Sequence, residues 1–571
     1  MTPTPKSPLA AAQAALTADQ TTNDPAIWIA KVPPETLLQH AQTLEAEGPK
    51  ARPLWGLTVA IKDNIDTAGL PTTAACPDFA YTPTASAPAV QRLIDAGALI
   101  LGKTNLDQFA TGLVGVRSPY GAPKNIFDAG RVPGGSSSGS AIAVAAGIAD
   151  LALGTDTAGS GRVPAAFGNI VGLKPTLGAI STTGVVPACR SLDTVSIFAR
   201  TVDAALAAQR VLAAFDPTDP YSRHAPPGYL RRAALPAATR LAIADIDALC
   251  EPETARLYRR AAALFDTNTV DLAPFLAIAR LLYDGPWVAE RTAALRAIVT
   301  GRPSIMHPVT RAIVEGGLTR KTVDAFDAFH DLAKTRRLAE TLFATHDALL
   351  VPTAPFCPTL AELDADPIGP NSRLGTFTNF VNLCDMAAIA VPAGFGADGL
   401  PVGVTVLGPA WSEGRLAAIA DRIYRAFTPD LPPAAAPCPL AADETALFCI
   451  GAHMAGLPLN TQVTSLGGRF LRPAQTQPIY RLHALGNRPG MAQGGSAAIV
   501  GEVWALPTAA IGALLAQVPP PLGFGTVALE DGPCLGFLAE SHALHSTEDI
   551  SQYGGWRAWI AARDAKQGTS A

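Results

Sequence analysis

Two glycine- and serine-rich clusters carry the hydroxyl groups that are best placed to do chemistry in this sequence. The first cluster runs from Gly134 to Ser140 (GGSSSGS), and the second runs from Gly154 to Arg162 (GTDTAGSGR). Glycine-rich backbone in a packed setting lets main-chain N–H groups point at a ligand. A small, mostly apolar segment lies between the two clusters and apolar sequence follows the second, so neither is typical of a flexible linker. The first cluster also lacks the lysine of a phosphate-binding loop, which disfavours a nucleotide site.

A hydroxyl nucleophile needs a base, and the candidate is Lys62. No histidine lies near either cluster, whereas Lys62 follows the apolar run from Leu57 to Ile61, which predicts a buried strand. Burial disfavours the charged ammonium group and lowers its pKa from about 10.4, so that a neutral amine becomes available. A lysine at a strand end is by itself typical of a solvated surface charge. The hypothesis therefore depends on the lysine and the two clusters together.

The spacing of these residues resembles that of the amidase signature family. Ser136 lies 74 residues after Lys62, and Ser160 lies 24 residues after Ser136. The flanking segments PLWGLTVAIKDNID, ILGKTNLDQFATG and GLKPTLGAISTTGVVP are similar to the same family, and the resemblance covers about residues 25–425. It implies that Ser160 is the nucleophile, that Ser136 is a bridging serine after a cis Gly135–Ser136 peptide bond, and that Lys62 is the base.

The resemblance also implies an oxyanion hole in the second cluster. Preorganised backbone N–H donors stabilise the negative oxygen of a tetrahedral intermediate. Asp156 and Arg162 are interpreted as residues that organise this loop. Two positions depart from the family pattern, Ser138 and Ala158, where glycine is more usual, but neither change removes a catalytic group. The expected donors are the N–H groups of Thr157, Ala158, Gly159 and Ser160.

Other segments resemble the allophanate hydrolases within this family, among them TTAACPDFAY and TFTNFVNLCDMAAIAVPAGF. The resemblance implies that the substrate is allophanate, the carboxylated form of urea, whose carboxylate calls for a guanidinium partner. Residues 281–291 (LLYDGPWVAER) resemble a substrate-binding segment, which assigns Tyr283 and Arg291 to substrate binding. The alternative is a surface arginine beside a half-buried tyrosine. Gly112, in GLVG, is expected to line the same pocket.

The elements around these residues predict an α/β protein. The run 57–61 and the run 99–102 are typical of core strands, and residues 89–98 between them predict a helix. A more highly charged helical block is expected at about 250–347. The predicted large domain, residues 1–428, is an amidase signature domain with a mixed central β-sheet flanked by helices, and the helical block is its substrate-binding insertion.

A proline-rich segment separates the C-terminal part of the chain. Five of the eleven residues from Pro429 to Pro439 are proline, which neither a helix nor a sheet interior accepts. We predict a linker at 429–442 and a small α+β domain at 443–571. The segments GAHMAGLPLN and GEVWALP resemble a γ-glutamylcyclotransferase-like fold. The resemblance to allophanate hydrolases links this domain to decarboxylation of the N-carboxycarbamate, with His453 as the candidate residue; the alternative is a packed core histidine in a scaffold domain.

Composition excludes several classes of function. The chain has 571 residues, with 43 Lys and Arg against 48 Asp and Glu, and this net charge of −5 disfavours a nucleic-acid partner. No apolar run reaches the roughly 18 residues of a membrane span, and the N-terminus lacks a signal core, so we expect a cytoplasmic protein. The eight cysteines form no CxxC pair and are expected to be free thiols. No cluster has metal-ligand spacing, so neither a metal nor a cofactor is expected.

The resemblance implies that the protein is a cytoplasmic allophanate hydrolase, which releases ammonia and, after decarboxylation, CO₂. It would serve nitrogen use from urea, or from triazines and cyanuric acid. No biotin-attachment segment is apparent, so a urea carboxylase would be a separate chain, and the resemblance implies a homodimer. One alternative is another amidase of the family that acts on a short amide or biuret. A second alternative, an amidotransferase subunit that passes ammonia to a charged tRNA, is disfavoured by the net negative charge and the appended domain.

Overall fold

The structure is a computed structural model that describes residues 7–568. Residues 1–6 and 569–571, the outer ends of the two predicted domains, lie outside the described residues. The chain forms two compact units, which divide at residue 435, and the segments 226–240 and 344–347 belong with the C-terminal unit. The sequence did not predict that these two segments would join it. The predicted linker, 429–442, spans the passage from one unit to the other, and its bounds stay a prediction.

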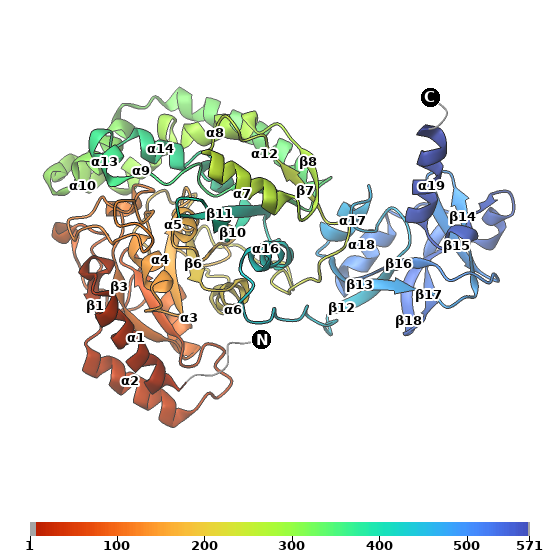
Figure 1. Ribbon diagram of the computed structural model, residues 1–571, viewed down its shortest axis with the longest axis horizontal. Coiled ribbons are helices and arrows are strands. Elements are labelled where there is room, and N and C mark those ends of the chain that lie inside the picture. The colour runs from red at the N-terminus through yellow and green to blue at the C-terminus, as the bar shows by residue number, and fades with distance from the viewer. Residues whose placement is uncertain (1–6, 569–571) are drawn as a thin grey trace. The chain divides into compact units, whose positions relative to one another are not determined.

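Within the described residues, the first unit contains one eleven-stranded mixed sheet (Figure 1). Strand β2 (Thr58–Lys62) pairs in parallel with β3 (Leu99–Thr104) and with β4 (Leu151–Asp156), and β4 pairs antiparallel with β6 (Thr194–Ala199). The predicted mixed sheet and its first two core strands are thereby confirmed. The other strands are β1 (Trp28–Lys31), β5 (Val171–Lys174), β7 (Arg240–Ile243), β8 (Asp266–Thr269), β9 (Ala348–Pro352), β10 (Met386–Phe395) and β11 (Pro401–Pro409).

Helices cover the sheet and bury its apolar strands. Helix α4 (Ser138–Ala145) packs against β4 and buries every residue from 138 to 144, which agrees with its small and mostly apolar residues. Helix α16 (Glu413–Phe427) packs on β10 and β11, and α6 (Val202–Leu212) packs on β6. The other helices of this part are α1 (Pro8–Thr22), α2 (Pro34–Glu47), α3 (Pro88–Asp95), α5 (Val163–Phe167), α13 (Leu360–Ala365), α14 (Gly369–Leu374) and α15 (Asn379–Leu383).

The predicted helical block lies together at the top of the first unit in Figure 1. Helix α9 (Trp287–Ala294) packs between α8 (Ala273–Asp284) and α11 (Pro308–Glu315). The block also contains the edge strand β8, which its charged sequence did not predict. Its other helices are α7 (Pro252–Ala262), α10 (Arg296–Gly301) and α12 (Thr322–Phe343).

The second unit is rich in strands. Strand β12 (Glu444–Cys449) pairs antiparallel with β16 (Val500–Pro507) and in parallel with β18 (Gly532–Ala539), within a five-stranded sheet. Buried aromatic side chains, including Phe448, Tyr480 and Trp504, form its core. Its remaining elements are β13 (Arg469–Gln475), β14 (Tyr480–Leu485), β15 (Arg488–Gln493), β17 (Leu522–Leu529), β19 (Glu548–Asp549), α17 (Asn460–Thr464), α18 (Ile511–Leu515) and α19 (Trp556–Gly568).

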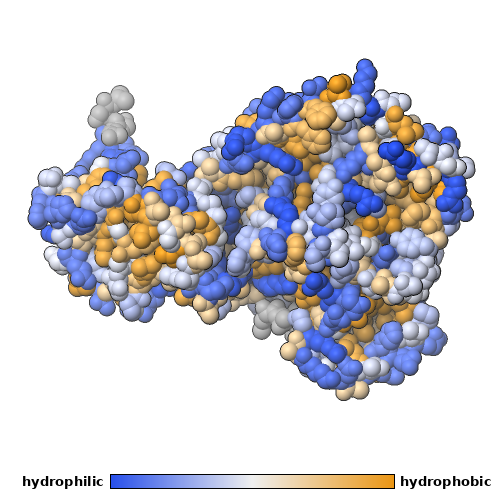
Figure 2. Space-filling view, turned by 180° about the vertical axis from the view of Figure 1, so that it is seen from behind, coloured by the Kyte–Doolittle hydropathy of each residue, from blue (hydrophilic) through white to orange (hydrophobic). Residues whose placement is uncertain are grey.

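Two further features concern the surface and the thiols. Hydrophilic residues cover much of the visible surface, with apolar patches between them (Figure 2). From residue 7 to residue 568, no helix combines the length and the apolar character that crossing a bilayer requires. All eight cysteines are free, as the sequence predicted.

Candidate active site

Lys62 is the last residue of β2 and is completely buried. Its amine donates a hydrogen bond to Ser136 Oγ at 2.8 Å and a second one to Thr155 Oγ1 at 2.7 Å. Thr155 lies near the end of β4, the strand that runs parallel beside β2. The parallel pairing therefore places the lysine and the threonine at the same edge of the sheet. Sequence reasoning missed Thr155, because only the strand pairing shows that it faces Lys62.

Burial lowers the pKa of Lys62 to about 7, because the ammonium group loses its hydration. The carboxylates of Asp107, Asp193 and Asp156 oppose this shift, and the positive charge of Arg291 adds to it. About half of the amine is then neutral at pH 7. A neutral amine in hydrogen-bond contact with a serine hydroxyl has the state and the position that a general base requires.

Ser136 stands at the turn into α4, in the first glycine-rich cluster. The Gly135–Ser136 peptide bond is cis, as the resemblance implied. Space around this turn is so tight that a Cβ on Gly135 would lie 2.1 Å from Asp107 Oδ2 and 2.5 Å from Gly115 N. In addition, the N–H of Asp107 donates to Ser136 O at 3.1 Å. Glycine is therefore required for this close approach, which fixes Ser136 beside the amine of Lys62.

Ser160 lies in the loop that follows β4, and only 2% of its surface is exposed. Within residues 7–568, no hydrogen bond joins its hydroxyl to Ser136. The structure thus brings Lys62 and Ser136 into contact and leaves the Ser160 hydroxyl without a protein partner. Catalytic hydrogen bonds are often long in the absence of substrate and tighten when substrate binds.

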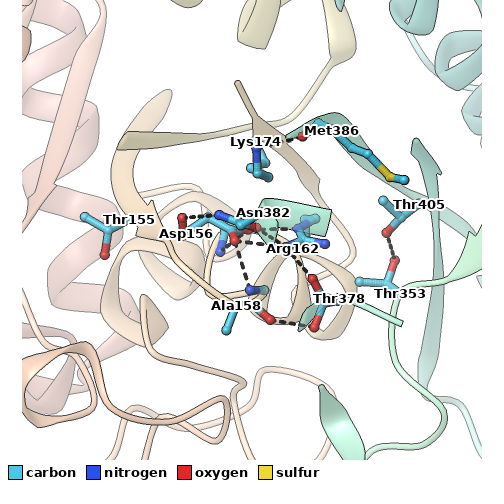
Figure 3. A network of polar contacts seen from close by, with 12 residues as sticks. Thr155, Asp156, Ala158, Arg162, Lys174, Thr353, Thr378, Asn382, Met386 and Thr405 are labelled. Carbon is cyan, nitrogen blue, oxygen red and sulfur yellow. Dashed lines mark hydrogen bonds and ion pairs between the residues drawn. The ribbon is translucent and has the colours of Figure 1, made fainter. Parts of the chain in front are cut away.

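Asp156 organises the loop that carries Ser160, as the sequence predicted (Figure 3). Its carboxylate accepts hydrogen bonds from the N–H groups of Gly159 at 2.9 Å and Gly161 at 3.1 Å. It also accepts two bonds from the guanidinium of Arg162, each at 2.9 Å, in a fully buried bidentate pair. Burial alone would raise the pKa of Asp156, but the charge of Arg162 and these hydrogen bonds hold it below its usual range.

Side chains from the region of α15 hold the same loop from the other side (Figure 3). The Asn382 amide donates to Asp156 O at 2.8 Å and to Leu192 O at 2.9 Å. The Thr378 hydroxyl donates to Ala158 O at 2.6 Å. The carbonyls of Asp156 and Ala158 thus have side-chain donors, which hold the loop in its position.

The N–H groups of this loop differ in their availability. Gly159 N donates to Asp156 Oδ1 at 2.9 Å, so this N–H already has an acceptor within the loop. In the described part of the chain, the N–H groups of Thr157, Ala158 and Ser160 have no hydrogen-bond acceptor. A buried backbone donor without an acceptor is costly. Three such donors beside a serine hydroxyl form a site suited to a negatively charged oxygen.

The predicted substrate-binding residues also lie together. Arg291, on α9, is 3% exposed, and its Nη1 donates to Thr111 Oγ1 at 2.7 Å. Its guanidinium lies 5.7 Å from the ring centroid of Tyr283, the penultimate residue of α8. Gly112 follows Thr111 with φ +155°, and a Cβ there would lie 2.6 Å from Asp107 Oδ2. Two segments more than 170 residues apart in sequence thus meet at Arg291.

The guanidinium of Arg291 has no direct ion-pair partner among the described residues, and the carboxylate of Asp193 senses its charge. None of the ion pairs among residues 7–568 includes it, so a buried guanidinium stands close to Lys62 without a carboxylate partner. A buried charge without a partner is expensive, and proteins retain such charges where a ligand supplies the counter-charge. The arrangement therefore suits an anionic ligand that reaches from Arg291 toward the serine hydroxyls.

His453 belongs to the second unit and lies after β12. Its Nε2 shares a hydrogen bond of 2.9 Å with Gln462 Oε1, and its ring stacks on Phe537 at a centroid distance of 4.7 Å. Burial lowers the pKa of His453, so the ring is neutral at neutral pH. These contacts are those of a packed histidine with one polar partner, and its functional role stays a prediction.

No group of three or more His, Cys, Asp or Glu side chains is arranged to hold a metal ion, as far as the described residues extend. The side chains that gather around Lys62 are instead hydroxyls, carboxylates and one guanidinium. This set can move protons and bind an anion.

The fold and the site together define an amidase-type hydrolase: a mixed eleven-stranded sheet, a buried lysine, and two serines in glycine-rich loops. Residues 12–417 match the family described as Amidase, and this chain belongs to that family. Residues 445–561 match a second family, described as the allophanate hydrolase C-terminal domain.

Individual proteins agree with this assignment. The solved structure of Kluyveromyces lactis allophanate hydrolase is 38% identical, covers 98% of this chain and 97% of its own, and gives a TM-score of 0.76. Urea amidolyase of Saccharomyces cerevisiae is 40% identical over 95% of this chain, although this chain spans only 31% of that protein. Urea amidolyase of Lachancea kluyveri is likewise 40% identical, over 94% of this chain and 31% of its own length.

Proposed function

We propose that this protein is an allophanate hydrolase. The observation that carries the proposal is the buried, unpaired guanidinium of Arg291, held beside a serine–serine–lysine cluster. Allophanate combines an amide with a carboxylate, so it offers a group to each part of the site. The similarity to a solved allophanate hydrolase over 98% of the chain supports the same substrate.

Proton transfer would begin at Lys62. The neutral amine accepts a proton from Ser136, Ser136 accepts one from Ser160, and the Ser160 oxygen attacks the carbonyl carbon of the terminal amide. When the tetrahedral intermediate collapses, the C–N bond breaks and the relay runs in reverse, so ammonia leaves with the transferred proton. Water then attacks the acyl-enzyme by the same route and releases the N-carboxycarbamate.

Charge stabilisation would come from the loop after β4. The free N–H groups of Thr157, Ala158 and Ser160 supply donors to the oxyanion, while Asp156 and Arg162 hold the loop in place. Losing one donor of such a hole typically raises the barrier by about 2.7–4 kcal/mol. Gly159 has a structural part in this proposal, because its N–H is committed to Asp156.

Substrate recognition would depend on Arg291 and Tyr283. The guanidinium binds the carboxylate, and the tyrosine ring beneath it keeps the guanidinium in place through a cation–π contact. Gly112 lines the pocket next to Thr111, the hydroxyl partner of Arg291. A neutral amide of similar size would lose the contact with Arg291 and keep all the contacts around Ser160.

The second unit would serve the second half of the reaction, in which the N-carboxycarbamate loses CO₂, and His453 is the residue that we propose for this step. A scaffold role, for instance in a homodimer, is the alternative. In the cytoplasm a urea carboxylase, or a triazine breakdown route, would supply allophanate. The urea amidolyase relatives, of which this chain spans 31%, support the link to urea.

The decisive experiment measures ammonia and CO₂ release from allophanate, biuret and an aryl amide. We expect allophanate to be turned over fastest, and Ser160→Ala and Lys62→Ala to lose about 10³-fold or more in kcat. Faster turnover of biuret or the aryl amide would refute the substrate assignment, and unchanged turnover in Ser160→Ala would refute the mechanism. His453→Ala should slow CO₂ release without slowing ammonia release.

A further inference from the structure

Glu290, the neighbour of Arg291 on α9, points at a different part of the site. Adjacent residues on a helix are about 100° apart, so their side chains contact different neighbours. Arg291 reaches the segment around Thr111, whereas Glu290 reaches the segment from Cys189 to Ser191. The two side chains thus join α9 to two separate segments of the first unit.

The contacts of Glu290 are close and numerous. Its carboxylate accepts hydrogen bonds from Ser191 N at 2.7 Å, from Ser191 Oγ at 2.7 Å and from the Cys189 thiol at 2.9 Å. Burial and the nearby carboxylate raise the pKa of the Cys189 thiol far above its usual value, so the thiol keeps its proton and remains a donor. Three donors from two residues fix this segment to the helix.

The same segment is fixed a second time by Asp193. The N–H groups of Ala188 and Cys189 donate to the Asp193 carboxylate at 2.9 Å and 3.1 Å. This carboxylate also accepts a hydrogen bond from the hydroxyl of Thr157. Thr157 carries one of the three free N–H groups of the loop after β4. A continuous set of hydrogen bonds therefore runs from α9 through residues 188–193 to the side chain of Thr157, the residue that carries that N–H group.

We propose that Glu290 is a positioning residue that couples the seating of the substrate-binding helix to the geometry of the oxyanion donors. Glu290 holds the segment 188–193 against α9, and from there Asp193 orients Thr157. The mechanism above gives Glu290 no role, and the inference rests on the proposed function in taking Ser160 as the nucleophile and α9 as the substrate-binding helix. Displacing a catalytic group by about 1 Å can cost 10²-fold in rate, so the coupling should be measurable.

Two assays test the coupling, both on the full chain. The first measures kcat and KM for ammonia release from allophanate. The second measures the rate at which an alkyl fluorophosphonate labels Ser160; the serine oxygen forms a bond to phosphorus, fluoride leaves, and the proton passes to Ser136 and Lys62. This probe needs an oxyanion hole but has no carboxylate for Arg291, so it reports on Ser160 and its donors whatever the natural substrate is.

We expect Glu290→Ala to lower kcat and the labelling rate about 10- to 100-fold, with KM within about threefold of wild type. Glu290→Gln should recover part of this loss, because its amide oxygen can still accept from Ser191 N. The double variant Glu290→Ala/Thr157→Val should have a kcat and a labelling rate no lower than those of the slower single variant. Both substitutions interrupt the same set of hydrogen bonds, so their effects should not add. Glu315→Ala, which removes an exposed helix-surface ion pair with Arg311, is the matched control.

Unchanged kcat and labelling in Glu290→Ala, or a rise in KM alone, would overturn the inference and leave the proposed function standing. Wild-type protein that neither labels nor turns over allophanate would overturn both. A labelled wild type that ignores allophanate would refute the substrate only, and the labelling rates would still decide the role of Glu290. If Glu290→Ala fails to fold, Glu290→Gln and Ser191→Ala are compared with wild type in the same two assays.

Discussion

The protonation state of Lys62 gives the sharpest quantitative prediction. A lysine with an ordinary pKa of about 10.4 is neutral in about one molecule in 2,500 at pH 7, whereas burial in this protein lowers the pKa to about 7 and makes roughly half of the amine neutral. Burial therefore supplies about 10³-fold more of the active base at neutral pH. Because the neutral form is the active one, reactivity should rise with pH through about 7 and then reach a plateau.

The rate of fluorophosphonate labelling of Ser160 between pH 5 and pH 10 measures this directly, since the probe itself does not titrate. We expect the second-order rate constant to be about 100-fold below the plateau at pH 5, with a midpoint near 7. Thr155→Val removes one acceptor from the amine; because the ammonium form loses more than the neutral form, the midpoint should move to lower pH.

Two results would refute this reasoning. A rate that is independent of pH down to pH 5 would show that no group with a pKa near 7 controls the nucleophile. A midpoint above pH 9 would show that the amine keeps its ordinary pKa and is hydrated. A midpoint near 7 that persists in Lys62→Met would assign the titration to another group, so this variant is measured in parallel.

Three other predictions concern binding and stability. Arg291→Ala should raise KM for allophanate about 10- to 100-fold and change kcat/KM for biuret by less than about threefold; equal effects on both amides would contradict the carboxylate contact. Asp156→Asn should lower the free energy of unfolding in urea by about 3–5 kcal/mol, because it leaves the Arg162 guanidinium buried without its counter-charge, and a loss below about 1 kcal/mol would contradict that view. Lys62→Met should have a higher free energy of unfolding than wild type below pH 7. This difference should shrink between pH 7 and pH 10, because there the unfolded wild-type chain binds a proton at Lys62 that the folded chain does not; a difference that does not change with pH would contradict the lowered pKa.

The sequence by itself was sufficient to identify the candidate residues for the chemistry. Lys62 and Ser136, which the family resemblance singled out, stand in contact, and Asp156 and Arg162 organise the loop between β4 and α5. The apolar runs at 57–61 and 99–102 predicted two central strands, and the segment between them predicted a helix. These features depend on local patterns of a few residues, which the sequence records directly.

Tertiary structure alone decided which groups face one another across those elements. Thr155 meets Lys62 because β2 and β4 pair in parallel, and no local pattern states which strands pair. The N–H group of Gly159 donates a hydrogen bond to Asp156 because the loop after β4 turns back on itself at this point. Glu290 reaches Ser191 across 99 residues of sequence. Contacts between distant segments depend on how the whole core packs. The sequence therefore determines which groups are available to react, and the fold determines how those groups are placed relative to one another.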